Sequence, residues 1–401
     1  MAEYDEMLWR ENAVNRVLSL RAAVLSDQPT ETVGLDAVAG RVTAESITAN
    51  RDVPDSDYAT MDGYALDAAD GYPLTVVSDE TFPEDEGAAL DVGEAVRIAT
   101  GAPLPERANA VLKREEASVE DGELTGPALE PGTDVYERGS NVARGEELFT
   151  TGELLSPKDS ILLGDLHHED VRVRERFSTA VLATGTEIHE GERQDLDSNM
   201  LTGLVRAWGH EATDEGSVPD ESDRVRDRLA GLVAEYDVVL TSGGTSVGKK
   251  DYVVRALADL GEVLFHQVRV RPGKPVAVAQ SDEGVFFAIP GKPVGAHTVA
   301  STVARPFFTG SGLLPTEAAT VTADVELGPE GFEYAIPVVR DGRKAVPLGH
   351  ISSELPVYET TFDPSVLSSS TRVTRADGLV LTRSALSAGE TVSVVPYPVL
   401  E

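Results

Sequence analysis

Between residues 177 and 310, apolar runs of strand length alternate with amphipathic runs of helix length, and the last run, 293–308, predicts one long helix. This alternation predicts a doubly wound α/β domain with a largely parallel sheet. Three predicted strands end in glycine-containing loops: ATGTE (183–187), TSGGTSVGKKD (241–251) and IPGKP (289–293). Because ligands bind beyond the carboxyl ends of such strands, these loops are the first candidates for a functional site.

The rest of the chain has different patterns of apolar residues. Residues 1–28 carry apolar side chains at helical spacing, beginning with Met7 and Leu8, and predict a helix. Short β-rich runs separated by Gly, Pro and Asp turns fill most of 42–135 and 316–401. We therefore predict a multidomain α/β protein with four parts: a central α/β domain at 176–313, an inserted β-rich domain at 46–135, a C-terminal β-barrel-like domain at 314–401, and an elongated N-terminal domain of helical and β segments built from 1–45 and 136–175.

The composition excludes several kinds of site. The chain of 401 residues has no cysteine, so disulfides and thiolate metal sites are excluded. Its seven histidines lack the spacing of a zinc site, and any metal should be a hard cation bound by carboxylates. No apolar run approaches the roughly 20 residues of a membrane span, and the acidic start lacks the basic and apolar regions of a signal peptide. We expect a cytoplasmic protein.

The chain is strongly acidic. Its formal net charge is −35, and the acidic residues are spread along the whole sequence. Such a surface argues against nucleic-acid binding, which needs a basic face. It favours adaptation to a salty cytoplasm, as in a halophile, and a charged face for a basic partner is the alternative. One window, 241–310, has the opposite balance: it holds eight Lys and Arg against five Asp and Glu, and it coincides with the glycine loops.

The loop at 241–251 has the features of an anion site. Gly243 and Gly244 would let backbone N–H groups approach an oxyanion, and the following helix would add its positive end. Hydroxyl donors flank the two glycines: Ser242, Thr245 and Ser246. A glycine-rich turn alone is more often only a turn, and this one is neither a Walker loop nor a GxGxxG fingerprint. Cationic side chains in the neighbouring loops nevertheless shift the prediction to a site for phosphate or another oxyanion: Arg271, Lys274 and Lys292.

Carboxylates lie near the same end of the predicted sheet. Glu187 follows one predicted strand, and Asp220 and Asp251 follow two others. Asp62 stands in ATMDGYA of the β-rich domain. Any one of them could be a helix cap or a solvated surface residue. Together they are of the type that holds Mg²⁺ between phosphate oxygens.

These motifs occur in an order that resembles a known family. The motifs follow one another along the chain as ATMDGYALD (59–67), TGAPLP (100–105), LATGTEI (182–188), DSNM (197–200), TSGGTSVGKKDY (241–252), VRPGKP (270–275) and IPGKPVGA (289–296). Over essentially its whole length the chain is similar to the molybdopterin molybdenumtransferases, the MoeA and gephyrin-E family. The resemblance implies four domains, a homodimer, and insertion of molybdate or tungstate into adenylated molybdopterin with Mg²⁺ and release of AMP. It also implies a molybdopterin adenylyltransferase as a partner.

The resemblance places functional positions on this sequence. They are Asp62, Thr100, Glu187, Asp220, Asp251, Arg271 and Lys274 and, by a looser match, Ser369. We predict catalytic roles for Asp62, Thr100, Glu187 and Asp251, and magnesium binding by Glu187, Asp220 and Asp251. The predicted substrate-binding residues are Ser242, Gly243, Gly244, Ser246, Lys249, Arg271, Lys274, Lys292 and Ser369.

The sequence departs from the family pattern at several of these motifs. Acids are replaced by Asn141, Thr186 and Lys249, Lys292 stands in place of the asparagine of PGNP, and Gln267 stands where a lysine often occurs. The site has thus lost negative groups and gained positive ones. The lost carboxylates keep open a second hypothesis, a non-catalytic paralogue that binds or stores the pterin or its metal-loaded form. A third hypothesis is an adenylyltransferase acting on molybdopterin, because TSGGTS also resembles the glycine loop of that family.

Overall fold

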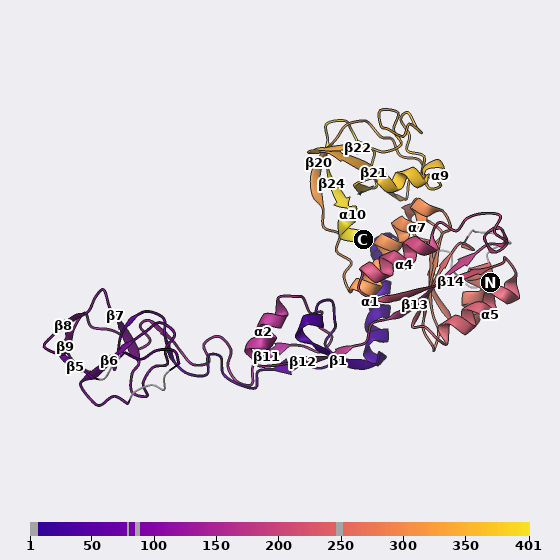
Figure 1. Ribbon diagram of the computed structural model, residues 1–401. Coiled ribbons are helices and arrows are strands. Elements are labelled where there is room, and N and C mark those ends of the chain that lie inside the picture. The colour runs from indigo at the N-terminus through magenta and orange to yellow at the C-terminus, as the bar shows by residue number, and fades with distance from the viewer. Residues whose placement is uncertain (1–6, 78–79, 85–88, 246–251) are drawn as a thin grey trace. The chain divides into compact units, whose positions relative to one another are not determined.

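The computed structural model describes residues 7–77, 80–84, 89–245 and 252–401. The chain divides into two compact units. The smaller unit is Thr30–Arg174, and the larger one combines Met1–Pro29 with Glu175–Glu401. Figure 1 shows the chain coloured along its length. The candidate anion-binding loops all belong to the larger unit.

A six-stranded sheet forms the centre of the larger unit, in the order β14-β13-β15-β19-β18-β16. The strands are β13 (Ser178–Thr184), β14 (Glu211–Val218), β15 (Val238–Ser242), β16 (Glu262–His266), β18 (Ala277–Gln280) and β19 (Val285–Ile289). The pairs β13–β14, β13–β15 and β15–β19 are parallel, and β18 runs antiparallel to both of its neighbours. The predicted doubly wound, largely parallel sheet is confirmed.

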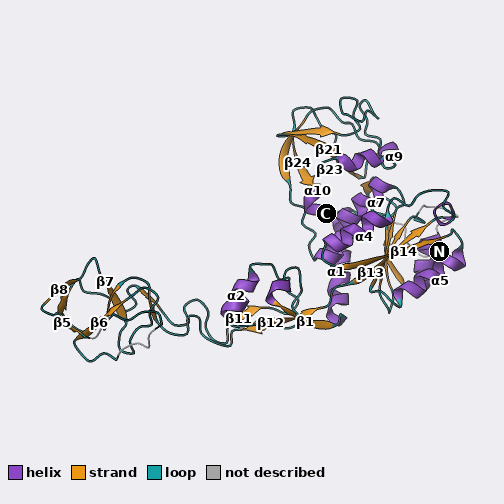
Figure 2. Ribbon diagram, viewed as in Figure 1, coloured by secondary structure: helices purple, strands orange, loops and turns teal. Residues whose placement is uncertain are grey.

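Helices cover both faces of this sheet, which is why β15 and β19 are buried along their whole length and are almost continuously apolar. One face packs against α1 (Arg10–Asp27), α4 (Ser198–Ala207), α7 (Pro293–Val299) and α8 (Arg305–Thr309). The other face packs against α5 (Ser222–Val233) and α6 (Tyr252–Leu260). Figure 2 shows the strands between these two helical layers.

Two predicted helices differ from their observed form. The first helix begins at Arg10, and Leu8 instead forms a β-bridge with Val268, so the prediction that Met7 and Leu8 are helical was wrong. The predicted long helix at 293–308 is interrupted by a π-helical turn, Ala300–Ala304, between α7 and α8. Pro306 has no N–H to donate to the carbonyl four residues earlier, so a regular α-helical ladder cannot continue through it.

The C-terminal part of the larger unit is a closed β-barrel. Its sheet has the order β17-β21-β22-β20-β24-β23, and an additional pairing of β21 with β23 closes the ring. The strands are β17 (Val270–Arg271), β20 (Glu317–Val321), β21 (Glu333–Asp341), β22 (Lys344–Pro347), β23 (Gly378–Thr382) and β24 (Thr391–Pro396). The predicted β-barrel-like domain is confirmed. Strand β17 comes from the α/β region, so the barrel is tied to the turn that follows it.

The smaller unit is built mainly of short strands. A six-stranded sheet has the order β7-β4-β6-β5-β9-β8. Its strands are β4 (Gly63–Leu66), β5 (Leu74–Val76), β6 (Glu94–Ile98), β7 (Ala110–Lys113), β8 (Ser118–Glu120) and β9 (Glu123–Thr125). The other elements are β1 (Thr30–Gly34) paired with β12 (Asp170–Arg174), β2 (Ile47–Thr48) with β11 (Glu147–Phe149), β3 (Tyr58–Ala59) with β10 (Val135–Tyr136), a 3-10 turn at Leu35–Ala37, and helix α2 (Asp159–Asp165).

The glycine of the MDGYA motif is required by this sheet. Gly63 begins β4, where an added Cβ would lie 2.0 Å from the carbonyl oxygen of Leu112 on β7. Any side chain at this position would force the two strands apart, and the loop that carries Asp62 would move with them.

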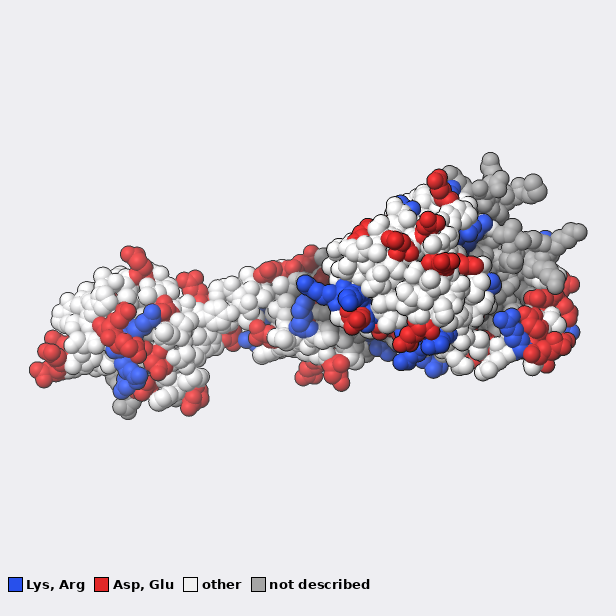
Figure 3. Space-filling view, turned by 90° about the horizontal axis from the view of Figure 1, so that it is seen from above, with Lys and Arg blue, Asp and Glu red and all other residues white. Residues whose placement is uncertain are grey.

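The exposed side chains agree with the acidic composition. Figure 3 shows acidic groups scattered over the visible face, with basic groups among them. Within the described ranges, none of the helices has the length and apolar character needed to cross a membrane.

A buried ion pair joins α1 to the barrel and generates a stability prediction. Nε of Arg10 lies 2.6 Å from a carboxylate oxygen of Glu333, with side-chain exposures of 12% and 7%. Glu333→Ala leaves the guanidinium buried without this partner, so we expect the free energy of unfolding to fall by about 3–5 kcal/mol. Urea unfolding followed by tryptophan fluorescence measures this loss, since both tryptophans, Trp9 and Trp208, belong to the larger unit.

The matched control is Glu317→Ala in the same barrel. Glu317 is 63% exposed and pairs with Arg340 at 3.0 Å, so its loss should cost less than about 1 kcal/mol. Equal losses for the two variants would show that the Arg10–Glu333 pair contributes no more than a surface ion pair.

Candidate active site

A pocket of about 590 Å³ lies at the carboxyl ends of the parallel strands of the larger unit. Its walls include residues after β13, β15 and β19, Arg271 at the end of β17, the turn 272–275 that follows it, and the segment 193–197 before α4. The barrel contributes residues at the start of α9 (Pro364–Leu367). Within the described residues, the structure therefore brings the loops after β13 and β19, residues 242–245 of the loop after β15, and RPGKP together around one cavity.

Glycines allow the strand ends to approach this closely. Gly243 has φ +94°, and an added Cβ would lie 2.8 Å from the carbonyl oxygen of Thr184 at the end of β13. An added Cβ at Gly291 would lie 3.0 Å from the Cα of Gly243. The N–H of Gly243 donates to the carbonyl of Ile289 at 2.9 Å, so this group holds β15 to β19. Gly243 shapes the pocket through its missing side chain, and its N–H is not free for an anion.

Three cationic side chains line the pocket as the sequence predicts: Arg271, Lys274 and Lys292. The guanidinium carbon of Arg271 lies 4.1 Å from the centre of the Phe332 ring, and this cation–π contact fixes the plane of the guanidinium. The Nζ of Lys292 lies 3.4 Å from the carbonyl oxygen of Ser365. Such a group of donors, with a planar fork at Arg271, suits a phosphate or another oxyanion.

Carboxylates line the same cavity. Glu187 belongs to the short helix α3 (Thr186–His189), and Asp220 follows β14. The backbone N–H of Asp220 donates to the hydroxyl of Thr186 at 3.1 Å, so the residue that replaces a family acid now holds the Asp220 loop. Among the described residues, no three Asp, Glu or His side chains are grouped closely enough to hold a metal ion. The third predicted ligand, Asp251, lies outside these residues, and the magnesium trio stays a prediction.

Ser242 and Asp197 form a buried pair in the pocket. Ser242 is one of the predicted site residues, and Asp197 is not. The hydroxyl of Ser242 donates to Oδ2 of Asp197 at 2.8 Å, and both residues line the pocket. Burial raises the pKa of Asp197 above its ordinary value, and the hydrogen bond from Ser242 acts in the opposite direction. The sequence held one signal for Asp197, its place in DSNM, but an aspartate before a helix is usually interpreted as a cap.

Asp62 and Thr100 meet in the smaller unit. The backbone N–H and the hydroxyl of Thr100 both donate to Oδ1 of Asp62, at 2.8 and 2.7 Å. These hydrogen bonds lower the pKa of Asp62 below its ordinary value, because they stabilise the ionised carboxylate. Both side chains are exposed, so the pair presents a fixed negative charge to solvent.

The remaining predicted residues have varied places. Ser369 is exposed and is not part of the pocket wall, to which Ser365 and Ser368 contribute instead. Gly244 lies in the wall with φ +65°. Three predicted residues lie outside the part of the chain that the structure describes: Ser246, Lys249 and Asp251.

Two of the departures from the family pattern are engaged through their backbones. Gln267 has φ +72°, and its N–H donates to the carbonyl of Val276 at 2.7 Å. The N–H of Asn141 donates to the carbonyl of Val53 at 3.0 Å.

Comparisons with known proteins agree with this architecture. Residues 10–166 match the family model of the MoeA N-terminal region (domain I and II), and residues 180–310 match a probable molybdopterin binding domain. The molybdopterin molybdenumtransferase of Haemophilus influenzae is 31% identical over 291 residues, which cover 70% of this chain and 72% of that protein. The enzyme of the same name from Nostoc is 30% identical over 312 residues, covering 72% of this chain and 71% of that protein.

A solved structure extends the likeness to the whole chain. The molybdopterin biosynthesis MoeA protein of Pyrococcus horikoshii aligns with a TM-score of 0.73 and 27% identity, covering 98% of this chain and 99% of that one. A second structure from the same organism has a TM-score of 0.72 at 23% identity and shows the same fold. The ordered motifs, the pocket at the strand ends and these similarities show that the chain belongs to the molybdopterin molybdenumtransferase (MoeA) family, whose members are transferases of molybdenum cofactor biosynthesis.

Proposed function

We propose that this transferase of molybdenum cofactor biosynthesis inserts molybdate or tungstate into adenylated molybdopterin and releases AMP. The observation that carries the proposal is that one pocket at the carboxyl ends of the parallel strands is lined both by Arg271, Lys274 and Lys292 and by carboxylates. The substrates are anions, namely the oxyanion and the phosphates of the nucleotide-bearing pterin. The cationic side chains suit these anions, and the carboxylates suit a cation that offsets the charge of the phosphates.

The cationic side chains have a direct role in this scheme. When the phosphoanhydride bond to the adenylyl group is cleaved, negative charge develops on the separating phosphate oxygens. Arg271 can donate two parallel hydrogen bonds to a phosphate, and its contact with Phe332 holds that fork in one plane. Lys274 and Lys292 add point charges from neighbouring loops, and they stabilise the separating phosphates more than the intact substrate.

The pocket also has donors that suit Mg²⁺. Glu187 and Asp220 supply the hard oxygen ligands that this ion takes, and Asp251 completes the set in our proposal. When bound, the ion would offset the charge of the phosphate oxygens. Thr186 keeps the Asp220 loop in place through its hydroxyl, so the loss of an acid at this position does not remove the support of Asp220.

The reaction is tested by incubating the protein with adenylated molybdopterin, Mg²⁺ and molybdate or tungstate and measuring AMP. We expect AMP release that depends on the oxyanion. Lys274→Ala should lower kcat/KM by about 10- to 100-fold, because a charged hydrogen bond contributes roughly 1.5–3 kcal/mol. The control is Lys344→Ala, which removes an exposed lysine from β22 of the barrel and should leave the rate unchanged.

Other outcomes of this assay would replace the proposal. Tight pterin binding without AMP release would identify a binding or storage protein. Release of pyrophosphate from ATP and molybdopterin would identify an adenylyltransferase. Equal rates for the Lys274 and Lys344 variants would remove the pocket from the reaction.

Asp62 and Thr100 give a second test, based on pH. Because the hydrogen bonds of Thr100 lower the pKa of Asp62, the carboxylate should stay ionised to a lower pH than an ordinary aspartate. Thr100→Val removes the hydroxyl donor and keeps the backbone N–H, so the pKa of Asp62 should rise partway to its ordinary value. If AMP release needs the ionised form, the acidic limb of its pH profile moves upward as well.

The measurement is an NMR titration of the Asp62 carboxyl carbon. Thr125→Val is the control, since the hydroxyl of Thr125 donates to the carbonyl of Ser118 within the same unit. An Asp62 that titrates identically in the parent and in Thr100→Val would show that the hydroxyl does not stabilise the carboxylate.

Three further properties complete the proposal. We propose that the protein acts as a homodimer, which sedimentation at working concentration would test, and that it receives its substrate from a molybdopterin adenylyltransferase. We also propose that the net charge of −35 is an adaptation to a salty cytoplasm. Screening of self-repulsion then stabilises the fold, and a melting temperature that does not rise from low to molar salt would contradict this adaptation.

A further inference from the structure

Asp197 has a side chain that the proposed phosphate chemistry does not use. It stands directly before α4, but it forms no capping hydrogen bond with this helix. Asp195 takes that role, because its Oδ1 accepts the N–H groups of Asp197 and Ser198 at 2.9 and 3.1 Å. The Asp197 side chain instead lies in the pocket wall with only 4% of the residue exposed. A purely structural cap does not account for this position.

The carboxyl of Asp197 is only half satisfied. Oδ2 accepts the hydroxyl of Ser242, and Oδ1 is buried with no hydrogen-bond partner in the described part of the chain. A buried oxygen of this kind is costly to leave unpaired. Burial also raises the pKa of Asp197, because desolvation disfavours the charged form of the carboxyl. A ligand that brings hydrogen-bond donors to this wall would supply the missing partners.

We propose that Asp197 recognises the pyrimidine edge of the pterin through its adjacent N3–H and 2-amino donors, an inference that rests on the proposed function. An ionised carboxylate only accepts hydrogen bonds, and it pairs best with two parallel donors. The pterin edge offers such a pair, and the adenine ring does not.

The rest of the substrate fits other parts of the pocket. Adenine presents its amino group beside a ring nitrogen that accepts hydrogen bonds, and this nitrogen would face the lone pairs of the carboxylate. The phosphates are anions and would be repelled by Asp197. They fit Arg271, Lys274 and Lys292, which line the same cavity from other loops. The pocket therefore offers a carboxylate for the pterin edge and cationic side chains for the phosphates.

The test compares two probes that differ at one group. The first is 6-hydroxymethylpterin, and the second is the corresponding lumazine, in which a carbonyl replaces the 2-amino group. In the parent protein, a fluorescence titration should show at least tenfold tighter binding of the pterin, because the lumazine turns a carbonyl oxygen toward Asp197. Asp197→Asn should abolish or reverse this preference, since the amide can donate to that carbonyl.

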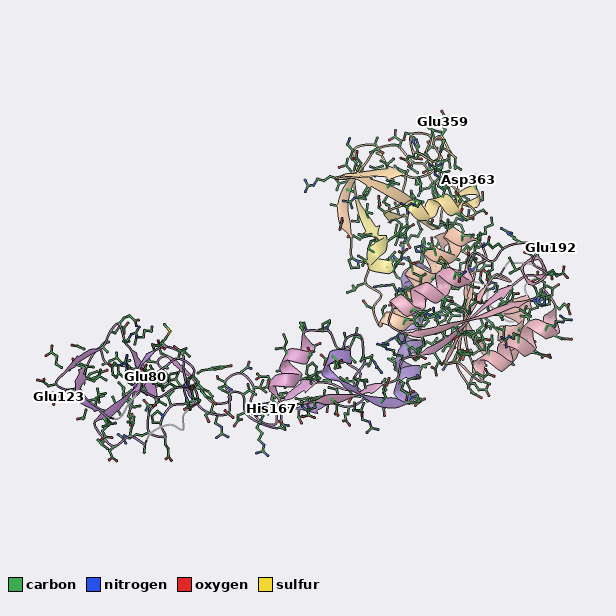
Figure 4. All side chains as sticks on the ribbon, viewed as in Figure 1. Glu80, Glu123, His167, Glu192, Glu359 and Asp363 are labelled. Carbon is green, nitrogen blue, oxygen red and sulfur yellow. The ribbon has the colours of Figure 1, made fainter. Side chains whose placement is uncertain are left out.

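Two controls separate recognition from folding. Asp197→Asn should bind AMP within twofold of the parent, because Arg271, Lys274 and Lys292 are unchanged. Glu192→Gln alters an exposed acid on the segment before Asp197, marked in Figure 4, and should keep the full pterin preference. The parent-protein comparison of the two probes needs no variant, so it remains decisive if Asp197→Asn does not fold.

Three results would overturn the inference: equal affinities of the parent for the two probes, an undiminished pterin preference in Asp197→Asn, or no binding of the pterin probe at millimolar concentration. Failure of this inference can be told apart from failure of the proposed function. Oxyanion-dependent AMP release without pterin discrimination would refute only the role of Asp197. Discrimination without AMP release would refute only the proposed reaction.

Discussion

The close approach of β13, β15 and β19 at their carboxyl ends is the constraint on which the site depends. Side chains have no room there: a Cβ on Gly243 would lie 2.8 Å from the Thr184 carbonyl oxygen, and one on Gly291 would lie 3.0 Å from Gly243. Because the three loops begin from this packed point, they reach one cavity. Glu187, Ser242 and Lys292, which are far apart in the sequence, then line the same cavity.

The sequence predicted the sheet well because its signals are local and repeated. Apolar runs such as VVLTS and VFFAI must be buried on both faces, and only a sheet between helical layers buries them. The sequence pattern did not predict the π-helical turn at Ala300–Ala304, because the pattern of apolar residues stays helical there and only Pro306 alters the hydrogen bonding. It also gave no sign that Val270–Arg271 would add a strand to the barrel, since a two-residue pairing depends on tertiary contacts.

The site was predicted unevenly for a similar reason. Residue type and motif order identified the cations and carboxylates of the cavity. Asp62 and Thr100 were predicted as functional only through the family resemblance, and their mutual hydrogen bonds were not predicted. Residue type and motif order could not show that the Gly243 N–H is used within the sheet or that Asp197 turns from its helix to Ser242. Thr186 illustrates the limit: as a substitution it suggests a lost acid, and in the structure its hydroxyl supports Asp220.

The account's central claim is that backbone packing at the strand ends creates the binding site. Its most direct test is the AMP affinity of Gly243→Ala, measured by calorimetry beside Gly203→Ala. Gly203 lies in α4, where an added Cβ meets no atom within 4 Å. The account predicts at least tenfold weaker AMP binding for Gly243→Ala in a protein that remains folded, and unchanged binding for Gly203→Ala. Parent-like AMP affinity in Gly243→Ala would contradict it.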